Sequence, residues 1–251
     1  MDAVLLQRLA QITEEERELL QGRGVDRALY ASGRAFEVDA AKMLEKGKLM
    51  SIRPHTRFAP FPRHSHNYVE IMYMCRGKTV HRIDGDALVT LEAGELLFLN
   101  RHASHAIQRA DAGDIAVNFI VLPQFFDEAF NMAGMDNVLS RFLLGELYTG
   151  GAAVSYLHFR VREVLPVQNL VENMVWTLVN RQPGARRINQ VTMGLLLLQL
   201  MHYTECIDMS RNGSIRSPMV EAALREIEEN YRAASLTDVA AAFHVGRPAW
   251  I

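Results

Sequence analysis

Apolar and polar positions repeat with two different periods along this chain. Up to residue 21, apolar residues recur three to four positions apart among acidic ones, which predicts an amphipathic helix that ends near Gly22. Over residues 48–122, short apolar stretches alternate with turn-forming residues, which predicts closely spaced β-strands in a sandwich or barrel. Asp84-Gly85 is the strongest hairpin signal among these turns.

The helical period returns over residues 125–209. We expect one helix from Pro166 to Asn180 and a more apolar one from Arg187 to Asp208. The stretch "GLLLLQLM" offers more apolar area than one helix needs internally, so these two helices are the expected surface of a homodimer.

Composition narrows the class of protein. The chain has 251 residues, 49% of them apolar, and a formal net charge of -2, so it lacks an overall basic footprint for nucleic acid. Its two cysteines form no metal-binding pair and no disulfide framework. No signal peptide is recognisable, and the most apolar run is too short to cross a bilayer. We therefore expect a cytoplasmic protein without a membrane partner.

The segment "PRHSHNYVEIMYM" carries the candidate chemistry. If residues 62–74 form one strand, alternate side chains share one face. His105 follows on a second element, which begins near Gly94. The residues that we expect to line a ligand pocket are His64, His66, Tyr68, Glu70, Met72 and His105.

Three imidazoles and one carboxylate suit a divalent transition metal with open positions for a further ligand. The candidate metal ligands are His64, His66, Glu70 and His105. The alternative is that these groups contact an organic ligand directly, or satisfy one another and water at the mouth of a barrel. We expect no catalytic residue among them, and each of the other histidines is expected to be a surface or hydrogen-bonded residue.

These residues resemble the two motifs of the cupin superfamily. The first motif matches in full, as His64-x-His66-x3-Glu70-x6-Gly77. The second matches at Gly94 and His105, but Asn100 and His102 replace the usual proline and glycine, and Arg109 replaces the usual asparagine. The resemblance implies a jelly-roll-like β-barrel.

The stretch "SLTDVAAAFHVG" carries a second resemblance. Ser235 and Asp238 form a capping box, and the apolar positions from Leu236 to Phe243 follow the spacing of a helix face. The stretch resembles the first helix-turn-helix of AraC-type transcription regulators. The recognition helix, which would enter the major groove, is cut off within about its first turn. We therefore do not expect this chain itself to bind DNA specifically.

Together the segments resemble an AraC-family regulator with an N-terminal cupin sensor. The implied fold class is α+β, with the cupin barrel followed by a helical linker and dimerisation region and an incomplete helix-turn-helix. The expected domains are an N-terminal helix and arm (1–47), a cupin sensor barrel (48–124), a helical linker (125–210) and the start of the DNA-binding domain (215–251).

The implied partner is a small-molecule effector, such as a sugar or a related metabolite. DNA is the second partner that the resemblance implies for a regulator with a complete DNA-binding domain, but not for this chain. The alternative function is a metal-dependent cupin enzyme with a helical extension.

Overall fold

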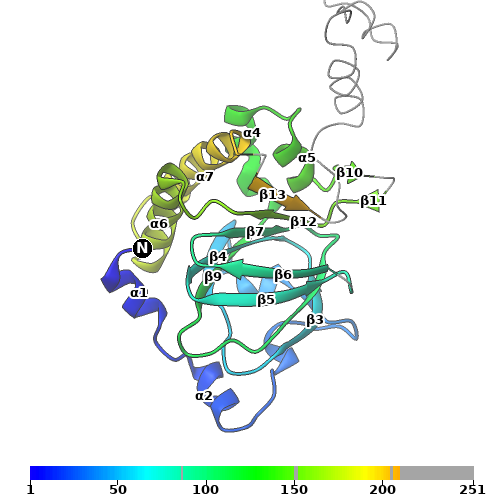
Figure 1. Ribbon diagram of the computed structural model, residues 1–251, viewed down its shortest axis with the longest axis vertical. Helices are drawn as coiled ribbons and strands as arrows, with labels where there is room; N and C mark the ends of the chain where they lie inside the picture. Colours follow the sequence, from blue (N-terminus) through cyan, green and yellow to red (C-terminus); the bar gives the residue numbers. More distant parts are fainter. Residues whose placement is uncertain (86, 150–151, 204–205, 210–251) are drawn as a thin grey trace, which may run out of the picture. The chain divides into compact units, whose positions relative to one another are not determined.

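Two mostly antiparallel sheets face each other in the computed structural model, which describes residues 1–85, 87–149, 152–203 and 206–209 (Figure 1). The five-stranded sheet has the order β1-β3-β8-β5-β6. Its strands are β1 (Glu37–Val38), β3 (Phe61–His66), β5 (Lys78–Ile83), β6 (Ala87–Glu92) and β8 (Ser104–Ile107). All of its pairings are antiparallel except that of β1 with β3.

The six-stranded sheet has the order β13-β12-β7-β4-β9-β2. Its strands are β2 (Met50–Pro54), β4 (Val69–Arg76), β7 (Leu96–Leu99), β9 (Ile115–Val121), β12 (Tyr156–Phe159) and β13 (Ile207–Met209). A separate hairpin consists of β10 (Tyr148–Thr149) and β11 (Ala152–Ala153). The described part of the chain is therefore an α+β fold with antiparallel-rich sheets, in agreement with the predicted cupin-like class.

Burial explains why the two sheets differ in sequence. In β5 and β6, buried and more exposed residues alternate, because only one face of each strand meets the core. In contrast, β4, β7 and β9 are buried along almost their whole length and read as continuous apolar runs. Helices cover the second face of this sheet.

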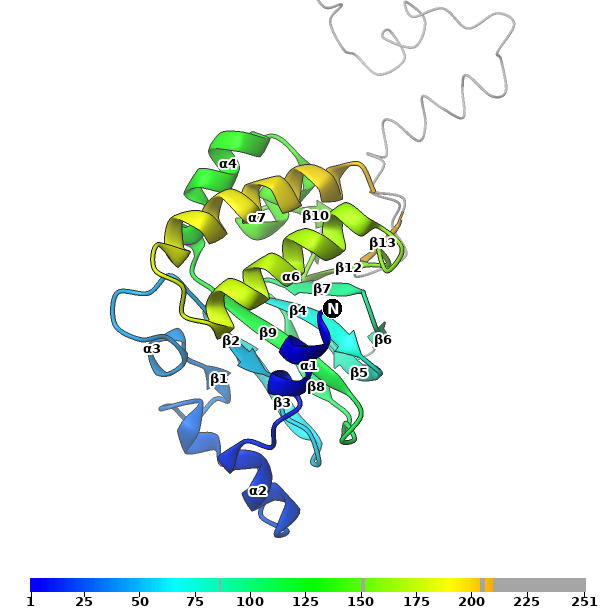
Figure 2. The same ribbon diagram turned by 90° about the vertical axis from the view of Figure 1, so that its left-hand side faces the viewer.

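The helices lie mainly on one side of the six-stranded sheet, where α6 and α7 run side by side (Figure 2). The α-helices are α1 (Ala3–Leu9), α2 (Glu14–Leu20), α3 (Ala40–Met43), α4 (Asp127–Ala133), α5 (Val138–Leu143), α6 (Leu165–Val179) and α7 (Ala185–Met201); the 3-10 helices are η1 (Arg27–Leu29) and η2 (Pro123–Phe126). The two helices predicted around residues 166–180 and 187–208 are confirmed, although the second ends at Met201.

The apolar residues of α7 are buried within the chain itself. A side chain added at Gly194 would meet Met132 and Ala129 of α4, which shows how closely the two helices pack. Leu196, Leu197 and Leu200 are fully buried, whereas Leu195 is 44% exposed. Most of the apolar area of α7 is therefore used internally, and the dimer surface stays a prediction.

Three sequence-based expectations about elements are wrong. The first helix is split in two, because Thr13 begins α2 with a capping box to Glu16. The predicted single strand over residues 62–74 is broken at residues 67–68, so that β3 and β4 lie in different sheets. The region over 125–209 is not entirely helical, since it also supplies strands, two of them in the six-stranded sheet. A short apolar run such as Tyr156–Phe159 cannot be distinguished from a piece of buried helix by periodicity alone.

The predicted hairpin is confirmed between β5 and β6. Asp84 has φ 50° and Gly85 has φ 92°, a conformation that Asp and Gly tolerate better than most residues. Among the described residues, no helix is both long and apolar enough to cross a membrane. The predicted helix-turn-helix segment, 215–251, lies outside the described residues.

Candidate functional site

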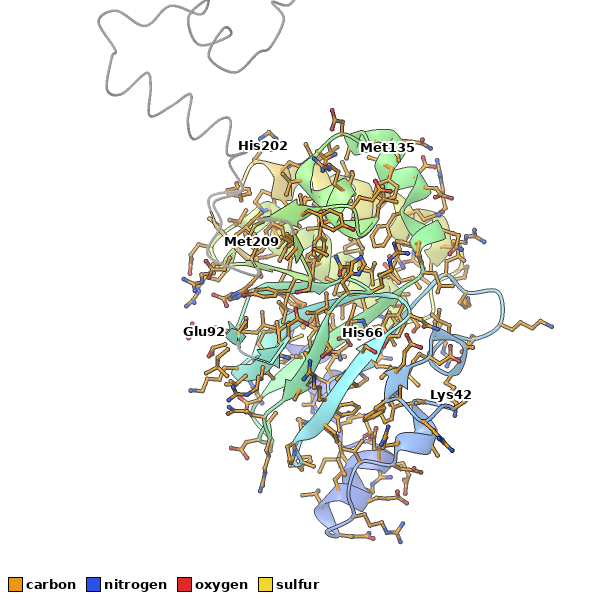
Figure 3. All side chains as sticks on the ribbon, turned by 90° about the vertical axis from the view of Figure 1, so that its right-hand side faces the viewer. Lys42, His66, Glu92, Met135, His202 and Met209 are labelled. Atoms are coloured by element: carbon orange, nitrogen blue, oxygen red, sulfur yellow. The ribbon has the colours of Figure 1, made fainter. Side chains whose placement is uncertain are left out.

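The corner between β3 and β4 assembles the candidate site inside the barrel. His64 and His66 lie at the end of β3, Tyr68 lies in the bend, and Glu70 lies on β4. His105 comes from β8, where the register of the sheet places it opposite His64. Figure 3 shows His66 among the strands, well away from the exposed Lys42. Two sheets thus supply the histidines and the carboxylate.

The four predicted metal ligands converge. One ligand atom from each of His64, His66, Glu70 and His105 lies within 4.8 Å of all the others. Glu70 Oε2 lies 3.6 Å from His66 Nε2 and 3.4 Å from His105 Nε2. All four side chains are buried.

Most of these buried polar atoms have no hydrogen-bond partner in the described part of the chain. This holds for both ring nitrogens of His66, both of His105, and Glu70 Oε2. Buried polar atoms in proteins are nearly always paired, so a cluster of orphaned ones needs a physical explanation. A cation bound among them would satisfy the donor set, which consists of nitrogen and carboxylate oxygen.

Hydrogen bonding also favours His64 as a ligand. Its Nδ1 lies 2.9 Å from the carbonyl oxygen of Pro62. If Nδ1 carries the proton and donates it to this carbonyl, Nε2 is left with a free lone pair. The main chain of β3 can thus set the tautomer that coordination requires.

The electrostatic environment keeps the imidazoles neutral. Burial lowers the pKa of His66 to about 3, although the charge of Glu70 opposes this shift. Burial also lowers the pKa of His64, and it lowers that of His105 well below the usual range. Neutral imidazole is the form that binds a metal ion or accepts a hydrogen bond from an effector.

Three further residues lie next to the cluster, and the sequence motif did not predict them. Asn118 Nδ2 on β9 donates to Glu70 Oε1 over 3.0 Å, which leaves Oε2 facing the histidines. The His81 ring stacks on that of His105 with 5.8 Å between centroids. His55 is 3% exposed, and neither of its ring nitrogens has a hydrogen-bond partner among the described residues, so the expectation of a surface or hydrogen-bonded residue is wrong.

One of these residues leaves a recognisable signal in the sequence. Asn118 is the single polar residue in the apolar strand "IAVNFIV", and its amide faces the interior. His81 shares the buried face of β5 with Thr79, whose hydroxyl lies 2.8 Å from His81 Nε2. His158 agrees with the expectation of a hydrogen-bonded histidine, since its Nε2 lies 2.9 Å from Glu95 Oε2.

A small cavity adjoins the quartet. About 40 Å³ of it is open to water-sized spheres, which is room for only about two or three water molecules. His64, Tyr68 and Glu70 line it. Tyr30, Arg53, His55 and Asn118 also line it. Met72 is fully buried in the apolar core and does not line this cavity, so its role in binding stays a prediction.

The part of the chain that contains the quartet matches a known protein family. Residues 51–130, which contain the whole quartet, match the AraC-like ligand-binding domain. A search of curated proteins gives no match.

Solved structures give only weak overall similarity. An apo variant of ToxT from Vibrio cholerae is 11% identical, with a TM-score of 0.48 over 81% of this chain and 73% of ToxT. Unsaturated fatty acid-bound ToxT from the same organism is 11% identical, with a TM-score of 0.41 over 79% of this chain and 69% of ToxT. A cupin protein from Bacteroides fragilis is 28% identical, with a TM-score of 0.25 over 29% of this chain and 64% of that protein.

Proposed function

Since residues 51–130 are an AraC-like ligand-binding domain, we propose that this chain is the effector-sensing and dimerisation portion of an AraC-type transcription regulator. The barrel binds a small molecule, and binding shifts the population between two arrangements of the regulator. The observation that carries this proposal is the set of orphaned polar atoms beside a small cavity, all of them on residues of the matched region.

Each residue of the site has a distinct role in the proposal. His64, His66, Glu70 and His105 would hold a divalent transition metal, which would supply a positive charge that attracts an oxygen atom of the effector. Asn118 fixes the orientation of the Glu70 carboxylate. His55 lines the cavity, its ring nitrogens have no partner in the part of the chain that the structure describes, and it contacts the effector directly.

The size of the cavity limits the choice of effector. A sugar remains a candidate, but about 40 Å³ does not accommodate one in the present arrangement. A sugar therefore requires movement of the N-terminal segment, which contributes Tyr30, Val38 and Met43 to the cavity wall.

Dimerisation is proposed through α6 rather than through the apolar stretch of α7. Leu165 and Trp176 are 67% and 49% exposed. They are eleven residues apart, which places them about 20° from each other around the helix axis. One side of α6 therefore presents two large apolar groups to a second copy of the chain.

A metal-dependent cupin enzyme is the second candidate, and the convergence of the full ligand quartet favours it. We propose the sensor over the enzyme because the matched family is a ligand-binding domain. The sensor and the enzyme differ in the residues that the site requires. An enzyme needs side chains that act on a substrate as well as side chains that hold the ion.

Metal analysis and ligand-induced stabilisation separate the two functions. The protein is purified without a nickel column, its metal content is measured, and its melting temperature is followed with a panel of metabolites. The sensor predicts stabilisation by an unaltered small molecule, lost in Glu70→Gln. Turnover of a panel compound that is lost together with bound metal in His64→Ala and Glu70→Gln would instead establish the enzyme.

A further inference from the structure

The six-stranded sheet ends at β2, which pairs with β9 on one side and with no strand on the other among the described residues (Figure 2). Backbone N–H and C=O groups at such a free edge can pair with a further strand. Pro54, which has no N–H, limits this pairing at one end of β2. Residues 50–52 contain no proline, so the groups that lie beside them decide what this edge can bind.

The register with β9 determines which backbone groups of β2 point to the free edge. Just after β2, the His55 N–H donates to the carbonyl oxygen of Ala116 on β9 over 2.9 Å. Backbone groups alternate in direction along an antiparallel strand, so residues 51, 53 and 55 direct theirs toward β9. Met50 and Ile52 therefore direct their N–H and C=O groups away from β9, and no other described segment bonds to these groups.

A groove of about 410 Å³ lies along this free edge. Met50, Ser51 and Ile52 all line it. Successive residues of a strand point to opposite faces of a sheet, so a hollow that touches three in a row lies at the edge rather than on one face. The groove therefore provides space where a further strand would run.

The two faces of the sheet differ in what they offer beyond this edge. Ser51 lies opposite Ile120, which belongs to the barrel core, so Ile52 faces the other way, toward the helices. Leu178 of α6 gives the groove an apolar wall, and the segment 43–48 supplies another. The side chains of an added strand would also alternate, so that one set would contact Leu178 and the other set would contact the segment 43–48.

The charge of the groove favours an acidic partner. Lys48 and Arg181 line it together with one carboxylate, that of Glu45. Glu45 Oε1 lies 3.7 Å from Arg181 Nη2, whereas Lys48 has no ion-pair partner among the described residues. Edge-to-edge pairing with β2 of a second copy would bring the same cations together, which is unfavourable. A carboxylate on a bound segment would instead pair with Lys48.

We propose that the free edge of β2 binds an extended acidic segment of a partner protein, which adds a strand to the sheet. Main-chain hydrogen bonds to Met50 and Ile52 supply affinity, and the alternating side chains supply specificity. Apolar residues of the segment pack on Leu178, and an acidic residue pairs with Lys48. This interaction goes beyond the sensing of an effector in the barrel.

Two labelled peptides test the charge of the partner. Both have seven residues and blocked ends; valine alternates with glutamate in one peptide and with lysine in the other. Binding of each peptide to the full chain is measured by fluorescence anisotropy at low salt. We expect the glutamate peptide to bind at least about tenfold more tightly, because like charges oppose the lysine peptide. Absence of binding by the glutamate peptide, or equal affinity for both, would overturn the proposal.

Protein variants locate the bound peptide. Ile52→Pro removes an N–H at the free edge but none that bonds to β9, so it should weaken binding about tenfold, whereas Ile52→Val should not. Lys48→Glu should abolish the preference for the glutamate peptide. Lys78→Glu makes the same change on an exposed residue of β5 and should keep that preference. Unchanged binding in an Ile52→Pro variant that circular dichroism shows to be folded, or an unchanged preference in Lys48→Glu, would contradict the proposed site.

N-methylation of the glutamate peptide tests the main-chain pairing on the unaltered protein. Only every second N–H of an added strand faces β2. Methylation of one alternate set of peptide nitrogens should therefore abolish binding, and methylation of the other set should leave it intact. The same effect from both sets would overturn the strand pairing. A second copy as the occupant would appear as a change of oligomeric state in Ile52→Pro without peptide, which would also contradict the proposal.

Discussion

At the scale of single residues, the amide of Asn118 determines which oxygen of Glu70 faces the histidines. Its Nδ2 engages Oε1, so Oε2 is the oxygen that lies within 3.4–3.6 Å of the His66 and His105 rings. Mutation of residues that orient a metal ligand in this way typically costs about 10- to 100-fold in metal affinity. The site therefore depends on a residue that has no place in the sequence motif.

Replacing Asn118 by Leu should weaken metal binding about 10- to 100-fold, because the Glu70 carboxylate loses its orienting hydrogen bond. The dissociation constant for manganese, measured by calorimetry, checks this expectation. Asn131→Leu makes the same chemical change at an exposed position of α4 and should have no effect. Unchanged affinity in Asn118→Leu would remove the proposed role of this amide.

The motif glycine Gly94 has a structural role that can be separated from metal binding. It has φ 84°, and a Cβ atom there would lie 2.9 Å from Cα of Arg162. Gly85 has a similar φ of 92°, but nothing lies within 4 Å of an added Cβ. Gly94→Ala should therefore destabilise the protein by clearly more than the roughly 1–2 kcal/mol expected for Gly85→Ala from backbone strain alone. Urea unfolding of the two variants provides the comparison, and equal losses would contradict the packing argument.

At the scale of elements, a buried ion pair attaches α2 to the barrel. Arg57 Nε lies 2.7 Å from Glu16 Oε1, and both side chains are almost fully buried. The Arg57 guanidinium also donates to the carbonyl oxygens of Ala10 and Ala112. Removing one partner would leave an unpaired buried charge, which typically costs about 3–5 kcal/mol.

Glu16→Gln should therefore lower the free energy of unfolding by several kcal/mol at neutral pH. Burial raises the pKa of Glu16, but its hydrogen bonds to Arg57 and to the Thr13 N–H outweigh this, and the net pKa lies below 4.5. Because the folded-state pKa is depressed, the contribution of Glu16 is fully present above pH 4.5 and is lost as the pH falls through the folded-state value. Denaturant unfolding between pH 7 and pH 3 should show the two proteins converging. A constant difference over this range would contradict the ion-pair account.

The sequence predicts elements well where one period persists over many residues. Both long helices and the Asp84-Gly85 hairpin follow from local pattern and turn chemistry. The break after His66 does not, because alternation continues through it while the chain passes from one sheet to the other. The spacing of the motif alone identifies the four candidate ligands. His55 and His81 come near them only through the tertiary arrangement of β2 and β5, which sequence spacing does not reveal.

At the scale of the whole molecule, the proposed dimer rests on the exposed side of α6. Trp176→Glu should convert the dimer to a monomer, because the charge would have to be buried in the interface. Sedimentation velocity measures the change. The control is Arg181→Glu, which introduces a carboxylate near the same end of the helix. Position 181 is already charged and largely exposed, so this variant should leave the dimer intact. A monomeric wild-type protein, or a dimeric Trp176→Glu, would contradict the proposal.

The most direct test of the account is calorimetric titration of the metal-free chain with manganese or zinc. We predict one equivalent bound per chain, with binding lost in both Glu70→Gln and His105→Ala and retained in the exposed variant His202→Ala. Circular dichroism of each variant establishes that it is folded. Absence of stoichiometric binding by the wild-type chain, or undiminished binding in a folded Glu70→Gln variant, would contradict the claim that the orphaned polar atoms of the barrel form a metal-assisted effector site.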